Sequence, residues 1–589
     1  MTNSPSSPSR RASSPSESLR LWPGIVLLAL QWLGRFVVPI AFPDALPYGV
    51  MGALGFGLAI AVWWAFFSKA PRLERWGGVL VMIAGLAVTP YLLHESIRTG
   101  AMGMLFFIYV VPVLSLALVA WAVMRHRFPV NLRPLAMVAI LLLACGGWAL
   151  IRTGGFTGGI DSDFAWRWAK TPEERLLALG GNESAGKSAA VSAALTDGGD
   201  GPSWPGFRGS LRNSVISGVE IATDWATSPP KELWRRPIGP GWSSFAVQGD
   251  LFYTQEQRGE EEVVSCYHGG TGDLVWKHSD PARFWESNGG AGPRGTPTLH
   301  GGLVFSFGAT GILNALDAGN GALLWSRDAA SDTKAKLPTW GFAGSPLVVD
   351  DLVIIAASGS LIAYDLASGE PRWSGPAGGA GYSSPHFLTL EGVPQVLQIH
   401  GGGVISVSPT DGSLLWEHAW PGYPIVQPAL TAEGDLLVSA SSSSGLRRLA
   451  VSRSADGWNL EERWTSIRLK PYSSDFVVHK GHAYGFDGSI LACIELENGE
   501  RKWKGGRYGL GQLVLLEDQD LLLVLTEKGE LALVEATPEG FGELVRIPMI
   551  EGKTWNHPVL LEDRLLIRNG QEMVALQLPL TKLAVASVR

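Results

Sequence analysis

The 589-residue sequence has few cysteines and few charged residues. Only 3 cysteines occur, Cys145, Cys266 and Cys493, and they form neither a CxxCH haem-attachment motif nor a CxxC pair. This pattern argues against a covalently attached haem and against a thiol redox motif. Charged residues make up 17% of the chain and the net charge is −7. That balance does not suggest nucleic-acid binding.

The chain has long apolar runs in its first quarter. Each run is close to the ~20 residues that span a bilayer. Four further runs follow the first at once, so we do not interpret the first as a cleaved signal peptide. We predict an all-α five-helix transmembrane domain over residues 21–151, after a cytoplasmic tail of residues 1–20. The runs are residues 21–42, 46–67, 76–93, 101–124 and 135–151.

The basic residues between the runs predict the orientation of this domain. Before the segment that follows the fifth run, one side carries nine basic residues and the other side carries only Arg98. Lysine and arginine favour the cytoplasmic side, so the N-terminus is expected in the cytoplasm and everything after the fifth run outside it. This places the protein in the inner (cytoplasmic) membrane with the lipid bilayer as a partner. The nine are Arg10, Arg11, Arg20, Lys69, Arg72, Arg75, Arg125, Arg127 and Arg133.

Arg35 lies inside the first apolar run. An ionisable residue at membrane depth is a candidate functional residue. The alternative is an arginine that extends to the interface or pairs within the helix bundle. The sequence leaves both interpretations open.

A tryptophan recurs after short turns through the second part of the chain. The stretch "DAGNGALLWSRD" ends its apolar run on Trp325, and similar segments end on Trp234, Trp276, Trp373, Trp416, Trp464 and Trp503. An eighth copy has Val545 in the tryptophan position, and successive intervals are 42, 49, 48, 43, 48, 39 and 42 residues. A period in this range indicates a repeat architecture.

Each repeat predicts one blade of a β-propeller. The residues between tryptophans form short runs rich in Val, Leu, Phe and Ile, separated by Gly and Asp turns, which is the pattern of four short strands. Eight tryptophan positions predict an eight-bladed β-propeller over residues 204–589. The last repeat lacks its fourth strand, so we expect residues 230–238 to supply it and close the ring, with Trp234 as its plug.

The repeats resemble the PQQ-like propeller repeats named after pyrroloquinoline quinone, whose signature is an Asp-x-x-x-Gly turn followed by a tryptophan. This resemblance covers roughly residues 204–578 and implies two functional classes. One is the BamB-type assembly factors, which bind neither quinone nor calcium and act as binding or scaffold modules of the bacterial envelope. The other is the quinoprotein dehydrogenases, which bind both, and whose membrane-bound glucose dehydrogenases also have five spans and pass electrons to membrane quinone.

The first class is the main prediction: a ligand- or protein-binding scaffold with an envelope protein as a partner. The chain has ~47 residues per blade, little more than four short strands need, and it lacks the large insertions and the adjacent-cysteine disulfide of many dehydrogenases. No residue can be assigned a catalytic role. Under the alternative, the chain would bind pyrroloquinoline quinone and calcium.

The loops that lead into the inner strands of the blades predict a candidate ligand funnel. These loops and the loops between second and third strands are expected on one face of the propeller, and aromatic and charged side chains recur in them. The alternative is that the aromatics plug the channel and the charges pair with each other. The predicted funnel residues are Trp242, Glu256, Arg258, Arg294, Trp340, Tyr382, Tyr472, Arg507, Tyr508 and Trp555.

Residues 152–203 are expected to form an extracytoplasmic linker. It contains "GNESAGKS", Gly181 to Ser188, which fits a phosphate-binding loop pattern. That chemistry needs the loop between a buried strand and a helix. No such unit surrounds it, so we do not predict nucleotide binding.

Overall fold

The computed structural model describes residues 19–42, 45–158, 162–180, 202–441 and 443–581. The chain forms two compact units, one of residues 1–155 with 162–169, the other of residues 156–161 with 170–589. Most of the predicted cytoplasmic tail and the phosphate-loop-like stretch Gly181–Ser188 lie outside the described residues.

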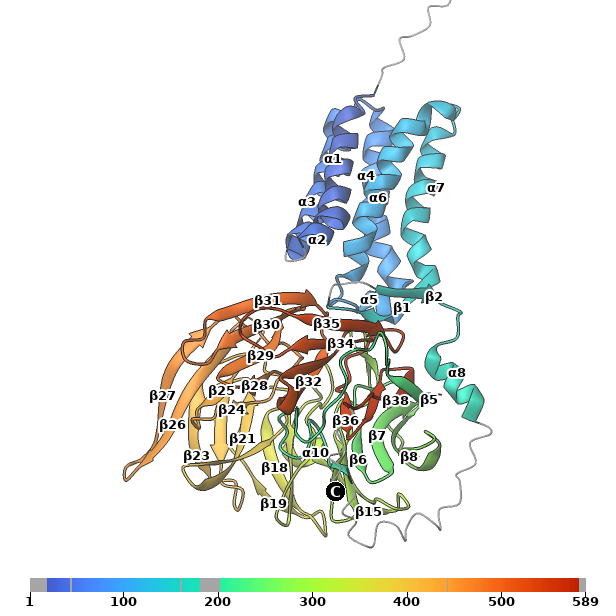
Figure 1. Ribbon diagram of the computed structural model, residues 1–589. Helices are drawn as coiled ribbons and strands as arrows, with labels where there is room; N and C mark the ends of the chain where they lie inside the picture. Colours follow the sequence, from blue (N-terminus) through green and yellow to red (C-terminus); the bar gives the residue numbers. More distant parts are fainter. Residues whose placement is uncertain (1–18, 43–44, 159–161, 181–201, 442, 582–589) are drawn as a thin grey trace, which may run out of the picture. The chain divides into compact units, whose positions relative to one another are not determined.

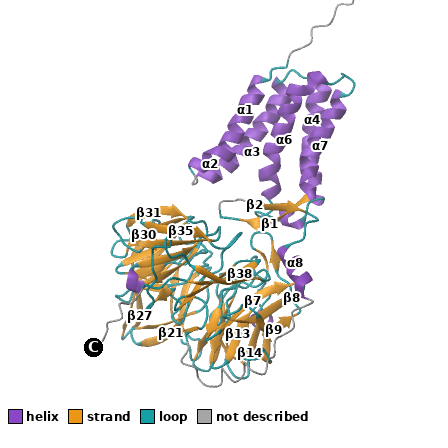
Figure 2. Ribbon diagram, turned by 45° about the vertical axis from the view of Figure 1, so that its right-hand side comes forward, coloured by secondary structure: helices purple, strands orange, loops and turns teal. Residues whose placement is uncertain are grey.

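The first unit contains five helices that are long and apolar enough to cross a membrane (Figures 1 and 2), as the sequence predicted. They cover Trp22–Ala41, Leu46–Phe67, Arg72–Tyr91, Leu105–Arg127 and Arg133–Leu150. A short hairpin of β1 (Ile151–Phe156) and β2 (Ser162–Trp166) follows. The helical segments are α1 (Trp22–Trp32), η1 (Leu33–Val37), α2 (Val38–Ala41), α3 (Leu46–Val62), η3 (Trp63–Phe67), α4 (Arg72–Val88), η4 (Thr89–Tyr91), α5 (Glu95–Arg98), α6 (Leu105–Met124), η5 (Arg125–Arg127), α7 (Arg133–Gly146) and η6 (Gly147–Leu150).

The second unit is an eight-bladed β-propeller of antiparallel four-stranded blades, which confirms the predicted fold. Glycine and aspartate turns connect the strands, and the buried faces of neighbouring blades share hydrophobic clusters, for example Phe305 of blade 2 with Ile355 of blade 3.

Blade 1 contains β6 (Ala246–Gln248), β7 (Leu251–Arg258), β8 (Glu261–His268) and β9 (Leu274–Asp280), and blade 2 contains β12 (Thr298–His300), β13 (Leu303–Phe307), β14 (Ile312–Asp317) and β15 (Leu323–Asp328). Blade 3 contains β16 (Leu347–Val349), β17 (Leu352–Ala357), β18 (Ser360–Asp365) and β19 (Pro371–Ser374). Blade 4 contains β20 (His386–Leu390), β21 (Val393–His400), β22 (Gly403–Val407) and β23 (Leu414–Ala419). Blade 5 contains β24 (Ala429–Leu430), β25 (Leu436–Val438), β26 (Leu446–Ser454) and β27 (Gly457–Ser466), and blade 6 contains β28 (Val477–His479), β29 (His482–Asp487), β30 (Ile490–Glu495) and β31 (Arg501–Arg507). Blade 7 contains β32 (Gln512–Leu516), β33 (Leu521–Leu525), β34 (Glu530–Glu535) and β35 (Glu543–Pro548). Blade 8 contains β36 (Val559–Leu561), β37 (Arg564–Arg568), β38 (Glu572–Gln577) and β5 (Lys231–Pro237).

In most blades the recurring tryptophan bonds to the next blade; the exceptions are blade 4, where Trp416 donates to Gln395 of the same blade, and blade 7, which has Val545 in this position. In blade 1 the indole Nε1 of Trp276 donates to the carbonyl oxygen of Ala318 in blade 2 at 2.9 Å, and in blade 2 Trp325 donates to Leu366 of blade 3 at 3.0 Å. The same ring covers the turn glycine of the next repeat. Gly321 has φ of 74°, and a Cβ there would lie 2.4 Å from the ring of Trp276. The Asp-x-x-x-Gly signature therefore provides both the left-handed turn and the space for the preceding indole.

The ring closes as the sequence predicted. Strand β5 pairs antiparallel with β38, and Trp234 lies opposite Ala575. The indole of Trp234 is 7% exposed and donates to the carbonyl oxygen of Gly269 in blade 1 at 2.8 Å. The outer strand of the last blade thus comes from the segment that precedes the first blade.

Candidate functional site

Residues 203–216 run through the centre of the propeller, and we call this segment the channel plug. Its first part, β3 (Ser203–Trp204), adds to the inner edge of blade 1 beside β6. Its last part, β4 (Val215–Ile216), adds parallel to the inner strand β32 of blade 7. Between them, the carbonyl oxygen of Pro205 accepts from Leu299 N in blade 2 at 2.7 Å. A segment that touches the inner strands of blades on several sides fills the central channel.

Arg208 holds the tip of the plug against blade 6. Its guanidinium donates to Ser214 Oγ at 2.6 Å and to the carbonyl oxygen of Phe476 at 2.9 Å, and it lies 3.6 Å from a carboxylate oxygen of Asp475. Burial lowers the pKa of Arg208 and raises that of Asp475, and the attraction between the two opposes both shifts. This is a buried ion pair with its remaining donors used by the plug and the channel wall.

Arg212 binds a different part of the channel wall, at blades 3 and 4. Its guanidinium donates to the carbonyl oxygen of Pro385 in the loop leading into blade 4 at 2.8 Å, and also to that of Pro346 in blade 3. Burial lowers the pKa of Arg212 to about 10. Ser214 then contacts blade 8, where its Oγ lies 2.8 Å from Nε2 of His557. Arg208, Arg212 and Ser214 all have positive φ, so the tip is a tight turn held by these contacts.

Aromatic side chains from the leading loops gather at the channel mouth in two groups. The ring of Trp340 lies 5.0 Å from that of Tyr382 and 6.4 Å from that of Tyr472, which joins blades 3, 4 and 6. The ring of Trp242 lies 4.8 Å from that of Trp555, which joins blades 1 and 8. These five predicted residues are therefore near aromatic neighbours, and all five are partly buried.

Lys553 and Glu527 complete the second aromatic group. The ammonium of Lys553 lies 4.3 Å from the ring centre of Trp555 and 5.2 Å from that of Trp242. The indole of Trp555 donates to Glu527 Oε1 at 2.7 Å, and the same oxygen accepts from Gly158 N at 2.8 Å. Part of the predicted linker therefore lies against this group.

Arg294 makes its contacts within the segment that connects blades 1 and 2. Its guanidinium lies 3.2 Å from Glu286 Oε1 and donates to the carbonyl oxygens of Gly290 and Gly292 at 2.9 Å and 2.8 Å. Burial lowers its pKa to about 10 although Glu286 opposes the shift. Glu286 belongs to a small hairpin of β10 (Trp285–Glu286) and β11 (Gly290–Ala291) between blades 1 and 2.

Glu256 and Arg258 pair with each other inside blade 1. Glu256 is fully buried and accepts from Ser265, from Tyr267 and from Arg258, the last at 3.1 Å. Burial alone would raise the pKa of Glu256, but Arg258 and the two hydroxyl donors together hold it below its ordinary value. A carboxylate satisfied in this way stabilises the blade.

Arg507 and Tyr508 do not join the two aromatic groups. Arg507 is exposed at the end of outer strand β31, where it donates to Ser489 Oγ at 3.0 Å. Tyr508 is buried, and its hydroxyl donates to Glu543 on β35 at 2.5 Å under the guanidinium of Arg546. Of the ten predicted funnel residues, the structure thus gathers five aromatics, pairs three charged residues locally and places these two elsewhere.

The predicted residues do not form an open site for pyrroloquinoline quinone and calcium. A tricarboxylate needs free cations, and calcium needs 6–8 oxygen ligands. Arg258 and Arg294 already contact carboxylates of their own, and no group of three or more His, Cys, Asp or Glu side chains among the described residues is placed to hold a metal ion. The plug also occupies the channel below the mouth.

Sequence reasoning missed the plug, Lys553 and Glu286. Most of the plug is the stretch that starts with "WPGFRG" at Trp204, which has no repeat pattern from which its position could be predicted. It also missed that the capping-box helix α8 (Pro172–Leu179) binds blade 1, where Glu173 accepts from Arg283 at 2.8 Å and 3.0 Å.

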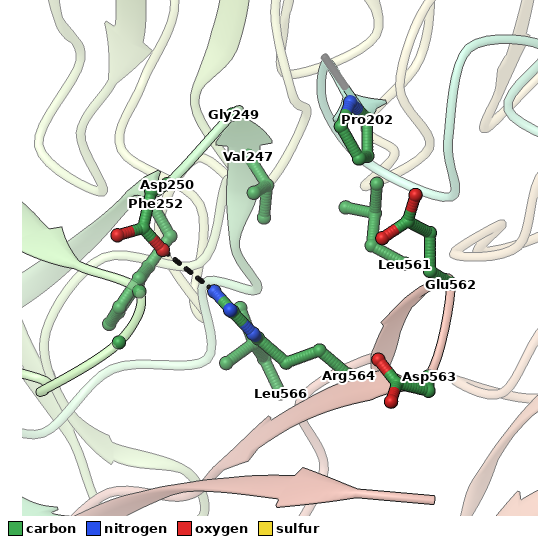
Figure 3. A pocket seen from close by; sticks show the side chains of 12 residues that line it. Pro202, Val247, Gly249, Asp250, Phe252, Leu561, Glu562, Asp563, Arg564 and Leu566 are labelled. Carbon is green, nitrogen blue, oxygen red and sulfur yellow. Dashed lines mark hydrogen bonds and ion pairs between the residues drawn. The ribbon is translucent and has the colours of Figure 1, made fainter.

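The opposite face of the propeller carries a pocket of about 390 Å³ at the seam between blades 8 and 1 (Figure 3). Val247, Phe252 and Leu566 line its apolar part. Arg564 lies 2.8 Å from Asp250 across the seam. Glu562 and Asp563 add two further carboxylates to the lining.

Glu262 on β8 gives a pH dependence of stability that is open to measurement. Burial raises its pKa from 4.5 to about 7, opposed by hydrogen bonds from Thr310 and Ala309 N. Between these two pKa values the folded chain keeps a proton on Glu262 that the unfolded chain releases. The free energy of unfolding therefore falls as the pH rises from about 4.5 to about 7, and above the pKa of the folded state it falls no further. Glu262→Gln is expected to remove this slope and to gain about 2–3 kcal/mol over the wild type near neutral pH or above. Unfolding measured from roughly pH 5 to pH 8 checks it, with exposed Glu261→Gln as the control; parallel pH profiles of wild type and Glu262→Gln would contradict it.

The fold and its repeats define a class: an eight-bladed propeller with PQQ-like repeats, preceded by five long apolar helices. A family model described as outer membrane protein assembly factor BamB matches residues 225–386 and 260–505. This match confirms the resemblance that the tryptophan repeats indicated.

Individual relatives match parts of the chain. BamB of Shewanella oneidensis is 23% identical over 389 residues, which cover 60% of this chain and 91% of that protein. BamB of Burkholderia pseudomallei is 27% identical, covering 28% and 42%, and the serine/threonine-protein kinase AfsK of Streptomyces griseus is 29% identical, covering 31% and 23%. The chain thus spans less than half the length of these last two relatives.

Solved structures also align with the chain at low identity. The crystal structure of BamB from Moraxella catarrhalis is 16% identical with a TM-score of 0.42, covering 59% of this chain and 97% of that one. A quinohemoprotein alcohol dehydrogenase of Pseudomonas putida HK5 is 14% identical with a TM-score of 0.48, covering 67% and 82%.

Proposed function

We propose that this chain is a membrane-anchored propeller of the bacterial envelope that serves as a ligand- or protein-binding scaffold. The observation that carries the proposal is the occupied channel. The plug binds the channel wall through Arg208 and Arg212, and two of the predicted funnel arginines, Arg258 and Arg294, pair with Glu256 and Glu286. A propeller in this state offers its faces and rims, rather than its axis, for recognition.

The alternative is a membrane-bound dehydrogenase that uses pyrroloquinoline quinone and passes electrons to membrane quinone. It would need cations free to meet the carboxylates of the cofactor and space on the channel axis. The plug occupies the axis, and Arg258 and Arg294 already contact carboxylates of the chain. Arg507 is exposed but lies at the end of β31, away from both aromatic groups, so this arrangement favours the scaffold.

An envelope protein partner fits the relatives that are assembly factors. A partner that docks on the propeller has at least one recess to use, the pocket at the seam of blades 8 and 1 (Figure 3). Its apolar floor and carboxylate rim suit a segment that combines an apolar and a basic side chain.

The proposed location is the inner membrane, with the N-terminus in the cytoplasm and the propeller outside. Five spans and the excess of basic residues on one side support it. In this orientation the propeller meets other envelope proteins.

The proposal is tested in two arms. First, an alkaline phosphatase reporter fused after Gly201 should be active and one fused after Arg75 inactive; equal activity at both sites would refute the orientation. Second, the full-length protein in detergent, incubated with pyrroloquinoline quinone and calcium, should not reduce an artificial dye when sugars or alcohols are added. Substrate-dependent dye reduction would establish the dehydrogenase instead.

A further inference from the structure

Arg35 is a cation placed within the first membrane span. The span covers Trp22–Ala41, so Arg35 lies six residues before its end, or about 9 Å along the helix axis. The helix is π-helical from Leu33 to Val37, a local widening that is frequent at functional sites. The residue is only 6% exposed.

The guanidinium of Arg35 lies between two aromatic rings. Its guanidinium lies 5.5 Å from the ring centre of Tyr109 on α6 and 5.0 Å from that of the neighbouring Phe36. Its Nε is buried and has no hydrogen-bond partner, and no carboxylate among the described residues forms an ion pair with it. Contacts with two aromatic rings offset only part of the cost of a charge at this depth.

Arg125 is a buried arginine of the same helix bundle that does have a carboxylate partner, and it serves as a comparison for Arg35. Its Nη2 lies 3.2 Å from Glu74 Oε1, and both side chains are largely buried. Arg35 is similarly buried, but no carboxylate among the described residues lies within ion-pair distance of it. In the part of the chain that the structure describes, its charge is therefore left without a counter-ion.

A second unsatisfied polar atom lies one turn earlier on α1. Gln31 is fully buried, and its Nε2 donates to the carbonyl oxygen of Ala53 on α3 at 2.7 Å, whereas its Oε1 has no partner. Three buried polar atoms within about one turn, Gln31 Oε1, Trp32 Nε1 and Arg35 Nε, have no partner, which marks a polar site inside an apolar bundle.

We propose that Arg35 binds the phosphate group of a membrane lipid. Guanidinium donors match phosphate oxygens in geometry and charge. A lipid brings its phosphate to this depth on apolar chains that the neighbouring helices accept, whereas a free phosphate would have to leave water. This site is independent of the proposed scaffold function of the propeller.

The test uses the full-length protein in mild detergent and native mass spectrometry. The probes are phosphatidylglycerol and a diacylglycerol with the same chains but no phosphate, each titrated into wild type, Arg35→Gln, Arg35→Lys and Arg98→Gln. Arg98 is the matched control because it is an exposed arginine of the same unit, on α5, where it lies 4.0 Å from a carboxylate oxygen of Glu95. A further arm adds inorganic phosphate as a competitor.

We expect wild type and Arg98→Gln to retain one phosphatidylglycerol, Arg35→Gln to lose retention at least tenfold, and Arg35→Lys to lose less, with no displacement by inorganic phosphate. Thermal unfolding checks that the variants are folded. Equal retention of phosphatidylglycerol by wild type and Arg35→Gln, or equal retention of the diacylglycerol by wild type, would overturn the proposal. Displacement by inorganic phosphate would show that the site takes free phosphate rather than a lipid. If Arg35→Gln does not fold, loss of the same lipid by the folded Arg35→Lys decides.

Discussion

Trp234→Ala is expected to lower the free energy of unfolding by about 3–5 kcal/mol, the usual cost of removing a large buried aromatic side chain. The indole of Trp234 stacks on Phe252 with ring centres 5.5 Å apart, donates to the carbonyl oxygen of Gly269 and covers Gly272. It is on β5, the strand that joins the first and last parts of the propeller. Its loss therefore weakens the closure of the ring as well as one blade interface.

Guanidinium unfolding of the full-length protein, followed by far-ultraviolet circular dichroism, measures this effect. Trp458→Ala is the control, since Trp458 is a partly buried tryptophan on β27 that does not occupy a repeat position. Equal destabilisation by the two changes would show that Trp234 adds no stability through ring closure beyond that of a tryptophan outside the repeat positions.

Arg208→Met is expected to destabilise the propeller by about 3–5 kcal/mol, because it leaves Asp475 buried without its cation. Arg208 is 2% exposed, and Asp475 also accepts from Gln427 N at 2.6 Å. The double variant Arg208→Met with Asp475→Asn should cost less than the sum of the single changes.

Arg236→Met is the matched control for this experiment. Arg236 forms an ion pair with Asp273 at 3.0 Å, but both side chains are largely exposed. Such a pair contributes about 0–1 kcal/mol. If Arg208→Met and Arg236→Met lowered the free energy of unfolding equally, Arg208 would not anchor the plug.

The blades could be predicted because each depends on a local pattern. The turn glycine and the tryptophan of a repeat lie within a few residues of each other, and contacts like that between Gly321 and Trp276 recur in several blades. The spacing of the repeats in the sequence therefore predicts how one blade packs on the next. The same holds for the spans, whose length and apolar composition are local properties.

The arrangement at the channel could be predicted only in part. The direction of the leading loops brings Trp340, Tyr382 and Tyr472 together. Tyr508 has the same sequence position in its blade, but its hydroxyl pairs with Glu543, a partner 35 residues away that no local pattern indicates.

The plug shows the limit most clearly. It has no repeat, and its place depends on bonds from Arg208 to Phe476 and from Arg212 to Pro385, 268 and 173 residues away. Only the folded channel, with its inward carbonyl groups, provides these acceptors.

Hydrogen–deuterium exchange of the channel plug in the full-length protein tests the central claim most directly. The amides of Gly209, Arg212 and Ser214 donate within the plug, and β3 and β4 pair with blades 1 and 7. Peptides covering 204–216 should therefore exchange as slowly as those from β7, without added ligand, whereas the exposed turn at 454–457 exchanges fast. Fast exchange over 204–216, or protection that appears only after pyrroloquinoline quinone and calcium are added, would show that the channel is open and available to a cofactor.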